Sequence, residues 1–143
     1  MAVFGKLWNG SLTIATVDMS ARCKSAVITL GKDELDLSVF GNLGKLRGTG
    51  LQDHTLTIVL EEDTAAAAGA GDVPVAHTLR DLWVAGVPFT VIYKNDTAAS
   101  GPTNPQYTCD FILTSLPIGG QHGALATYNL TLKSSGVVTI ADT

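Results

Sequence analysis

Hydrophobic and polar residues alternate along most of the chain, in short runs that are separated by turn residues. The clearest run is HTLTIVLEED, residues 54–63, in which Leu56, Ile58 and Leu60 fall on one side and threonines on the other. A period of two is typical of a β-strand with one buried face. The same alternation predicts further strands over residues 10–17, 23–30, 88–94, 106–116, 125–132 and 137–141.

One segment, residues 75–86, has helical spacing instead. It starts after Pro74 and ends on Gly86, which is the usual asymmetry of helix ends. Many short strands and one helix predict a mainly β fold, a β-sandwich or barrel of antiparallel strands with one α-helix packed on it. The apolar stripe that would pack on the strands consists of Val75, Leu79, Leu82 and Trp83.

Residues 31–53 are the least regular part of the chain. They contain one strand-like run, residues 35–40, and then several glycines, whose backbone entropy opposes regular structure. Long connections of this kind are often functional. Leucines stand beside Lys45 and Arg47 in this segment, and one subunit has little room to bury them. We therefore expect a long early loop that docks onto another surface.

The composition indicates a surface that is partly covered. The chain has 143 residues, which fits one domain over residues 1–143, and only 15% of them are charged. Soluble domains usually have about 25% charged residues, and the cores of protein interfaces are depleted of charge. The net charge of −4 argues against nucleic-acid binding as the main role, because phosphate neutralisation needs clustered Lys and Arg.

The start of the chain and its cysteines do not point to secretion. Residues 1–9 are apolar but lack the long hydrophobic core of a signal peptide. No stretch is long enough to span a bilayer, so we expect cytoplasmic synthesis and no membrane partner. Cys23 and Cys109 are far apart in sequence, and free buried thiols are favoured over a disulfide.

The sequence contains no pattern that is typical of an active site, a metal site or a cofactor site. His54, His77 and His122 have no metal-ligand spacing, so structural or surface roles are favoured. The acidic run at residues 61–63 fits a solvated strand end better than a cation or acid–base site. The glycines of residues 41–50 match neither phosphate-binding motif. We therefore predict a protein that is not an enzyme and that has no cofactor.

Taken in order, the segments of the chain resemble those of bacteriophage tail tube proteins, also called major tail proteins. The order and spacing of the segments carry the resemblance, which covers nearly the whole chain. The segments are LDLSVFG at 35–41, GLQDHTLTIVLEED at 50–63, LRDLWVAGVPFTVIY at 79–93, NPQYT at 104–108 and LTLKSSGVVTI at 130–140.

This resemblance implies a virion structural protein that assembles with copies of itself. Subunits of this family form hexameric rings, and the rings stack into a hollow tube whose inner barrel is built from the sheets of neighbouring subunits. DNA passes along the lumen during infection, and the tape-measure protein occupies it before then. The implied partners also include the tail terminator and tip proteins, and the implied location is the virion tail, after assembly in the host cytoplasm.

The resemblance also implies which segments would make contacts between subunits. By position, residues 31–53 would be an extended loop that reaches the adjacent ring, and residues 1–9 would be a contact arm. The implied arm contacts are Phe4, Leu7 and Trp8. The implied contacts between rings are Leu35, Leu37, Phe40, Leu43, Lys45, Leu46, Arg47 and Leu51.

An acidic channel would let DNA slide, because like charges repel the phosphates. We therefore hypothesise that some of the chain's carboxylates line the lumen. Two alternatives remain open: a capsid decoration or head–tail completion protein, which would bind a lattice without forming tubes, and an enzyme or a small-ligand-binding β-barrel. The candidates for the lumen are Glu61, Glu62, Asp63, Asp72 and Asp110.

Overall fold

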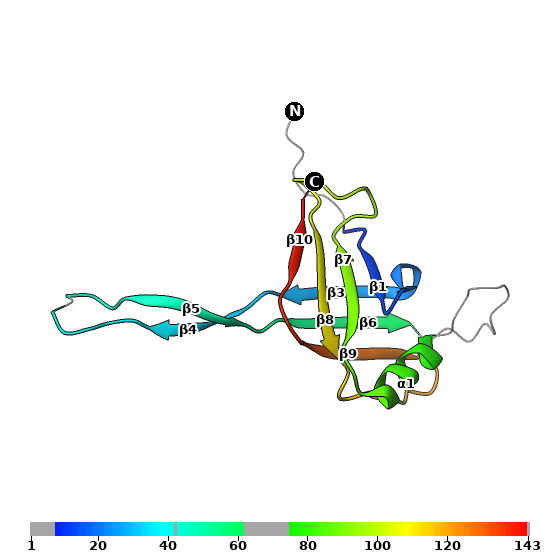
Figure 1. The fold of residues 1–143 in the computed structure, drawn as a ribbon. Helices are drawn as coiled ribbons and strands as arrows, with labels where there is room; N and C mark the ends of the chain where they lie inside the picture. The colour runs from blue at the N-terminus through cyan, green and yellow to red at the C-terminus, as the bar shows by residue number, and fades with distance from the viewer. Residues whose placement is uncertain (1–7, 42, 62–74, 143) are drawn as a thin grey trace.

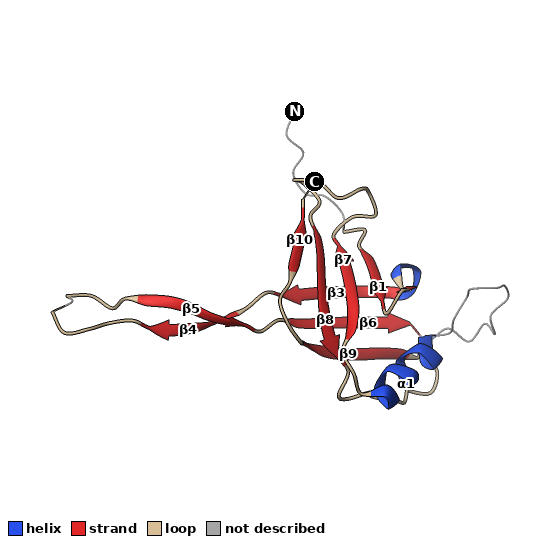
Figure 2. Ribbon diagram, in the orientation of Figure 1, coloured by secondary structure: helices blue, strands red, loops and turns tan. Residues whose placement is uncertain are grey.

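The structure, a computed structural model, describes residues 8–41, 43–61 and 75–142. Within these residues the chain forms ten β-strands, one α-helix and one short 3₁₀ helix (Figures 1 and 2). In chain order they are β1 (Ser11–Ile14), β2 (Val17–Asp18), η1 (Ser20–Arg22), β3 (Cys23–Thr29), β4 (Lys32–Asp36), β5 (Arg47–Gln52), β6 (Thr55–Glu61), α1 (Val75–Ala85), β7 (Phe89–Lys94), β8 (Gln106–Ile112), β9 (Thr127–Ser134) and β10 (Thr139–Ala141).

Eight of the strands form one bent antiparallel sheet in the order β2-β1-β7-β8-β9-β6-β3, with β10 paired to β8. Figure 1 shows two layers whose strands cross: β1, β7, β8 and β10 in one, and β3, β6 and β9 in the other. The layers join where Phe111 and Ile112 of β8 pair with Ser134 and Lys133 of β9. The two end strands of this order, β2 and β3, do not pair with each other in the described part of the chain, so the sheet stays open. The predicted mainly β class is confirmed, as a sandwich rather than a barrel.

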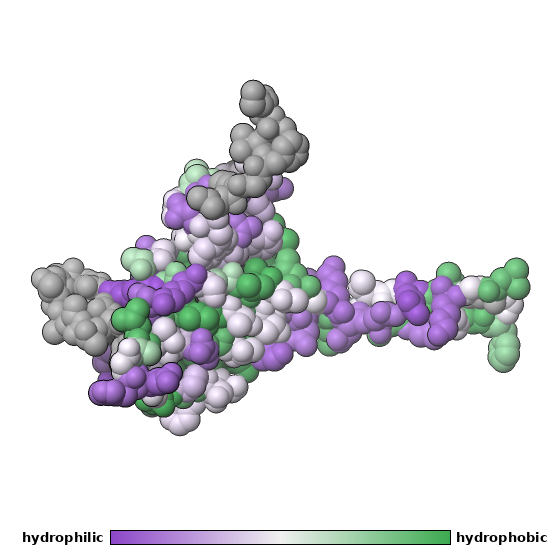
Figure 3. Space-filling model, turned by 180° about the vertical axis from the view of Figure 1, so that it is seen from behind, coloured by the Kyte–Doolittle hydropathy of each residue, from purple (hydrophilic) through white to green (hydrophobic). Residues whose placement is uncertain are grey.

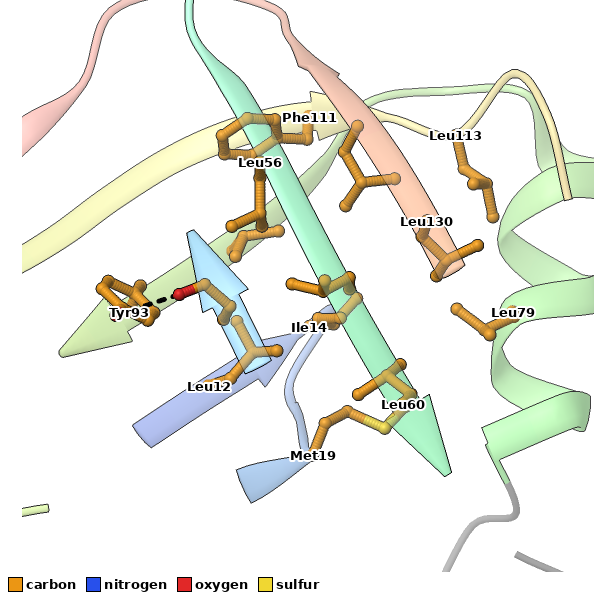
Figure 4. Close-up of a cluster of buried hydrophobic side chains, with 14 of the residues drawn as sticks. Leu12, Ile14, Met19, Leu56, Leu60, Leu79, Tyr93, Phe111, Leu113 and Leu130 are labelled. Atoms are coloured by element: carbon orange, nitrogen blue, oxygen red, sulfur yellow. Dashed lines mark hydrogen bonds between the residues drawn. The ribbon is translucent and has the colours of Figure 1, made fainter. Parts of the chain in front are cut away.

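The core lies between the two layers (Figure 4). Each strand turns alternate residues inward, which is why the period of two in the sequence identified the buried positions. On β6 the inward residues Leu56, Ile58 and Leu60 are fully buried, and on β8 Phe111 is fully buried. These side chains meet inward residues of β1, β7 and β9, so one apolar cluster holds both layers together.

Helix α1 covers one end of this core, and its first half follows the predicted stripe. Val75 and Leu79 are buried, whereas Trp83 is 51% exposed. The predicted burial of Trp83 is therefore wrong. The C-terminal part of α1 lies beside the loop after β8, where the Trp83 indole donates a hydrogen bond to the Thr114 carbonyl (3.3 Å). The helix ends as predicted at Gly86, whose φ of +64° suits a glycine after the last turn.

The first predicted strand, residues 10–17, is interrupted by a tight turn. Ile14 pairs with Val17 across Ala15 and Thr16, which both have positive φ. A two-residue hairpin turn of this kind needs positive φ at both central positions and usually uses asparagine or glycine. Neither residue is a usual turn former, so the alternation in the sequence concealed the turn.

Residues 31–53 are a β-hairpin instead of the irregular loop that the sequence predicts. Strands β4 and β5 pair as a separate two-stranded sheet that projects far from the two layers (Figures 1 and 2). Two of the glycines lie in β5 where a side chain would crowd the other arm of the hairpin. A Cβ on Gly48 would lie 2.8 Å from Leu37 Cδ1, and one on Gly50 would lie 3.2 Å from Asp33 Cβ.

Candidate assembly surfaces

The projecting hairpin carries the most accessible apolar side chains among the described residues. At its end Phe40 and Leu43 have relative exposures of 108% each, so no described part of the subunit covers them. In Figure 3 the hairpin ends in a cluster of hydrophobic residues, far from the body. All of the contacts predicted between rings are exposed: Leu35, Leu37, Phe40, Leu43, Lys45, Leu46, Arg47 and Leu51.

Hydrogen bonds order the hairpin in spite of its exposure. The backbone N–H of Leu37 donates to the carbonyl of Leu46 (2.8 Å), and the N–H of Leu46 donates to Ser38 Oγ (2.8 Å). The Asp36 carboxylate accepts the backbone N–H of Ser38 (2.9 Å), and this bond lowers the pKa of Asp36. Arg47 pairs with Glu34 across the two strands (2.9 Å). The apolar end is therefore presented on a paired scaffold, although isolated hairpins are marginally stable.

Only part of the predicted N-terminal arm can be placed, because Phe4 and Leu7 lie outside the described residues. Trp8 rests on its own subunit: its indole N–H donates to the Tyr93 hydroxyl (3.0 Å), which in turn donates to Asn95 Oδ1 (2.7 Å). The Trp8 ring also lies over Gly10, where a Cβ would clash at 2.2 Å. The ring, 45% exposed, lines a hollow beside Ala26 and Val27 of β3.

The hydroxyl of Tyr93 is expected to contribute to the stability of the subunit, through its hydrogen bonds with Trp8 and Asn95. We expect Tyr93→Phe to lower the free energy of unfolding by about 1 kcal/mol at neutral pH, because Trp8 and Asn95 lose their partner. Burial raises the pKa of Tyr93 above its ordinary value of 10.0, so the folded state favours the neutral hydroxyl. The wild-type protein should therefore lose stability as pH rises above 10.

Urea unfolding of both proteins at neutral and at alkaline pH measures the two effects. The difference between wild type and Tyr93→Phe should shrink at alkaline pH, because the variant has no phenol at this position. An equal difference at both pH values would contradict the assignment.

Of the acidic residues predicted for the lumen, the two that the structure describes do not lie on one surface. Glu62, Asp63 and Asp72 are outside the described residues. Glu61 is at the end of β6 and points away from the core on the layer of β3, β6 and β9, where it pairs with Lys24 (3.2 Å). Asp110 points outward from β8 on the other layer and accepts a hydrogen bond from Thr90 Oγ1 (2.9 Å). In one subunit these two carboxylates therefore face opposite directions.

The outward face of the layer of β3, β6 and β9 is rich in hydroxyl groups, which the search for charged motifs did not single out. Thr57 stands between Val27 of β3 and Thr131 of β9 in the strand register. In the next row Lys133 donates to Thr55 Oγ1 (3.1 Å). The alternating threonines of β6 were the available signal in the sequence, since they mark the strand's outer face.

The same layer has two long strands with open edges. Among the described residues, β3 pairs only with β6 along its seven residues. Strand β9 pairs with β6 on one side and, on the other, with β8 only at Lys133 and Ser134. Long open edges present unpaired N–H and C=O groups and are a liability that proteins normally cover. The edges of the other layer are short, since β2 has two residues and β10 has three.

A further exposed apolar set lies around the C-terminal end of α1 and the β8–β9 loop, at the end of the β3, β6 and β9 layer opposite to the hairpin (Figure 1). In the sequence, Trp83 belongs to the stripe that was expected to be buried, and the loop members of the set have no periodic pattern. Its members are Trp83, Val84, Val87, Ile118 and Leu125, which are all at least half exposed.

As candidate metal ligands, His54, His77 and the two cysteines differ in their burial and in their partners. His54 is fully buried, whereas His77 lies on the surface of α1 next to Asp81 (3.2 Å). Cys23 and Cys109 are both free, as predicted, and burial raises the pKa of both thiols. No three potential metal ligands come together in the described part of the chain. None of the helices that the structure describes has the length and hydrophobicity needed to cross a membrane.

Solved structures with the same fold come from phage-like tails. The chain superposes on a protein of the native gene transfer agent virion with a TM-score of 0.70 at 14% identity, covering 93% of this chain and 95% of that one. It superposes on a protein of the empty gene transfer agent tail, solved with C6 symmetry, with a TM-score of 0.64 at 14% identity, covering 84% of this chain and 82% of that one. On the SPP1 tail tube protein the TM-score is 0.68 at 8% identity, covering 94% of this chain and 77% of that one. At these identities the likeness shows the fold.

The family assignment rests on the sequence itself. A search of curated proteins found no match. The family model for phage tail tube proteins, in contrast, matches residues 62–140, which is more than half of the chain. The match includes α1 and the last four strands, and the fold of the remaining described residues agrees with it. The chain therefore belongs to the phage tail tube protein family.

Proposed function

We propose that this protein forms hexameric rings that stack into the tube of a phage-type tail, through which DNA leaves the particle. The observation that carries the proposal is the uncovered apolar end of the hairpin, Phe40 and Leu43, on a subunit that belongs to the tail tube family. Side chains of this kind need burial that only a second molecule provides. Function then resides in contacts between copies, and the proposal includes no catalytic step and no cofactor.

Within a ring, we infer that neighbours join through the open edges of β3 and β9. Pairing β3 of one copy with β9 of the next satisfies both rows of backbone groups and repeats around a closed ring without leaving an edge. Trp8 lies beside β3, so the predicted arm would begin at this junction. The roles of Phe4 and Leu7 in the arm remain predictions.

Between rings, the hairpin of one copy would dock on a copy in the adjacent ring. The hairpin and the apolar set around α1 lie at opposite ends of the same layer (Figure 1). A contact between two different patches of one chain is heterologous, and repeated heterologous contacts that do not close give a filament. This arrangement fits a tube that grows ring by ring.

The channel wall in this arrangement is the outward face of β3, β6 and β9, since this is the layer with the joining edges. It would carry threonine hydroxyls, the ion pair of Glu61 with Lys24, and Lys133, whose ammonium group donates to Thr55. Such a wall lacks a basic cluster that would hold phosphate groups. Asp110 would face away from the channel. Glu62, Asp63 and Asp72 remain predictions for the lumen, and so do the contacts with the tape-measure, terminator and tip proteins.

Electron microscopy of the purified protein tests the proposal. We expect rings with six-fold symmetry and, at higher concentration, hollow tubes. A capsid decoration or head–tail completion protein would instead remain free of tubes, and a ligand-binding β-barrel would stay monomeric. A map of the tube in which another face of the subunit lines the lumen, or in which Lys and Arg side chains other than Lys24 and Lys133 line it, would contradict the proposed channel wall.

A further inference from the structure

A buried histidine stands where the projecting hairpin meets the body. His54 lies between β5 and β6 and is only 1% exposed. Its Nδ1 accepts the backbone N–H of Gly31 (3.1 Å), and Nε2 lies 2.8 Å from Gln52 Oε1. Because Nδ1 accepts a hydrogen bond, the proton of the neutral ring is on Nε2, which donates to Gln52. One imidazole therefore joins the chain just before β4 to the last residue of β5.

The same contacts extend into the body of the subunit. Gln52 Oε1 also accepts the backbone N–H of Val138, in the segment that leads to β10 (3.0 Å). The backbone of His54 exchanges two hydrogen bonds with Ser134 at the end of β9, through its N–H to Ser134 Oγ (2.8 Å) and through its carbonyl from Ser134 N–H (3.0 Å). We call His54 and Gln52, with these bonds, the root clasp.

The hairpin continues the pair of strands β3 and β6 through two short links, residues 30–31 and 53–54. Among the described residues, every residue of β4 is exposed, and β4 and β5 pair with no strand of the main sheet. The N–H of Asp53 donates to the carbonyl of Gly31 (2.9 Å) between these two paired segments. The root clasp is the part of this junction that also bonds to β9 and to the segment before β10, so we expect it to set the angle of the hairpin against the rest of the body.

The hairpin acts as a long lever on this root. Each of its arms has about ten extended residues, which span about 33 Å, so a rotation of about 10° at the root moves the end by about 6 Å. A shift of that size would carry Phe40 and Leu43 off any surface that they fit. A hairpin that is held in one direction before docking also loses less conformational entropy when it docks.

We propose that His54 and Gln52 are positioning residues for tube assembly: the root clasp aims the hairpin, so that its apolar end meets the next copy. This inference rests on the proposed function, in which the hairpin docks between rings. It assigns an assembly role to a buried histidine and to a glutamine that bonds with it.

Two variants test the clasp. Gln52→Leu removes the acceptor that serves both His54 and Val138, on a residue outside the main core, and His54→Ala removes both imidazole bonds. We expect each variant to keep the thermal unfolding of a folded β protein and to form tubes roughly tenfold more slowly than wild type. Gln52→Glu keeps an acceptor oxygen and should recover most of the rate. His77→Ala, on the exposed face of α1, is the matched histidine control and should assemble like wild type.

The direction of the hairpin can be measured independently of assembly. Spin labels at Leu43→Cys and Ala99→Cys, in a Cys23→Ser background, report the distance from the hairpin end to the β7–β8 loop in unassembled protein. We expect one narrow distribution for the intact clasp and a broad one for Gln52→Leu. A simple loss of fold stability would lower the unfolding temperature without broadening this distribution in the folded protein.

The outcomes separate the clasp from the proposed function. If wild type forms tubes and folded Gln52→Leu forms them at the same rate, or keeps the narrow distribution, the clasp is overturned and the tube function stands. If wild type forms no tubes, the proposed function fails, whereas the distance measurement still decides whether the clasp directs the hairpin. If His54→Ala folds, it tests the role of the root clasp as well. If it does not fold, Gln52→Leu alone tests that role.

Discussion

Replacing Phe40 and Leu43 together by serine is expected to abolish tube growth and to leave folded subunits in solution. Both side chains are fully exposed in the subunit, so their loss removes no internal packing. Burial of an apolar side chain of this size in an interface contributes about 1.5–3 kcal/mol, so the pair contributes about 3–6 kcal/mol for each hairpin. Since about 1.4 kcal/mol is a tenfold change in affinity, half of this amount already weakens docking more than tenfold.

Electron microscopy and sedimentation measure the loss of tubes, and circular dichroism checks the fold. The matched control is Phe40→Leu with Leu43→Met, which keeps apolar side chains at both positions and should still form tubes. Normal tube growth by the double serine variant would refute the docking role of the hairpin. These substitutions are sharper than a deletion of residues 41–50, because that deletion also removes most of β5.

The second large effect is expected in the core, where Phe111→Ala should lower the free energy of unfolding by about 3–5 kcal/mol. Phe111 has no exposed surface and lies where β8 passes from one layer to the other (Figure 4). Its loss leaves a cavity between the layers that neighbouring strands can only partly fill. Because small domains have a total stability of about 5–15 kcal/mol, the variant should be partly unfolded near physiological temperature.

Urea unfolding followed by tryptophan fluorescence measures this change. Val137→Ala, on a residue that is 69% exposed, is the control and should stay within about 0.5 kcal/mol of wild type. An effect below about 1 kcal/mol for Phe111→Ala would show that the two layers do not depend on this residue. A failure of the Phe111 prediction would not affect the prediction for Phe40 and Leu43, since the hairpin end lies far from the core (Figure 1).

The proposed function depends on two kinds of surface, one apolar and one polar. The end of the hairpin, Phe40 and Leu43, is apolar and fully exposed, which suits a contact that forms once and persists. The proposed channel face is polar and hydroxyl-rich, and it carries no cluster of basic groups, which suits passage without binding. A subunit can carry both only because its strands turn alternate side chains to opposite faces and because the hairpin leaves the body.

The sequence predicted the strands of the main sheet well, because each has one buried face and so a period of two. It predicted α1 from its spacing and from the residues at its ends. The hairpin was described as an irregular loop, since none of β4 is buried and the glycines of β5 suggested disorder of the backbone. Gly48 and Gly50 in fact lie close to Leu37 and Asp33 of the other arm of the hairpin, and the sequence does not show these contacts because strand pairing brings the residues together.

By itself, then, the sequence determined the mainly β class, the position of the helix, the exposed leucines of residues 31–53 and the likeness to tail tube proteins. These follow from local patterns and from the order of segments. Only the tertiary structure decided that residues 31–53 pair as a hairpin, that Glu61 and Asp110 face opposite sides, and that His54 meets Gln52 and Gly31. The physical reason is that strand pairing, the crossing of the two layers and burial join residues far apart in the chain, and no short pattern records such contacts.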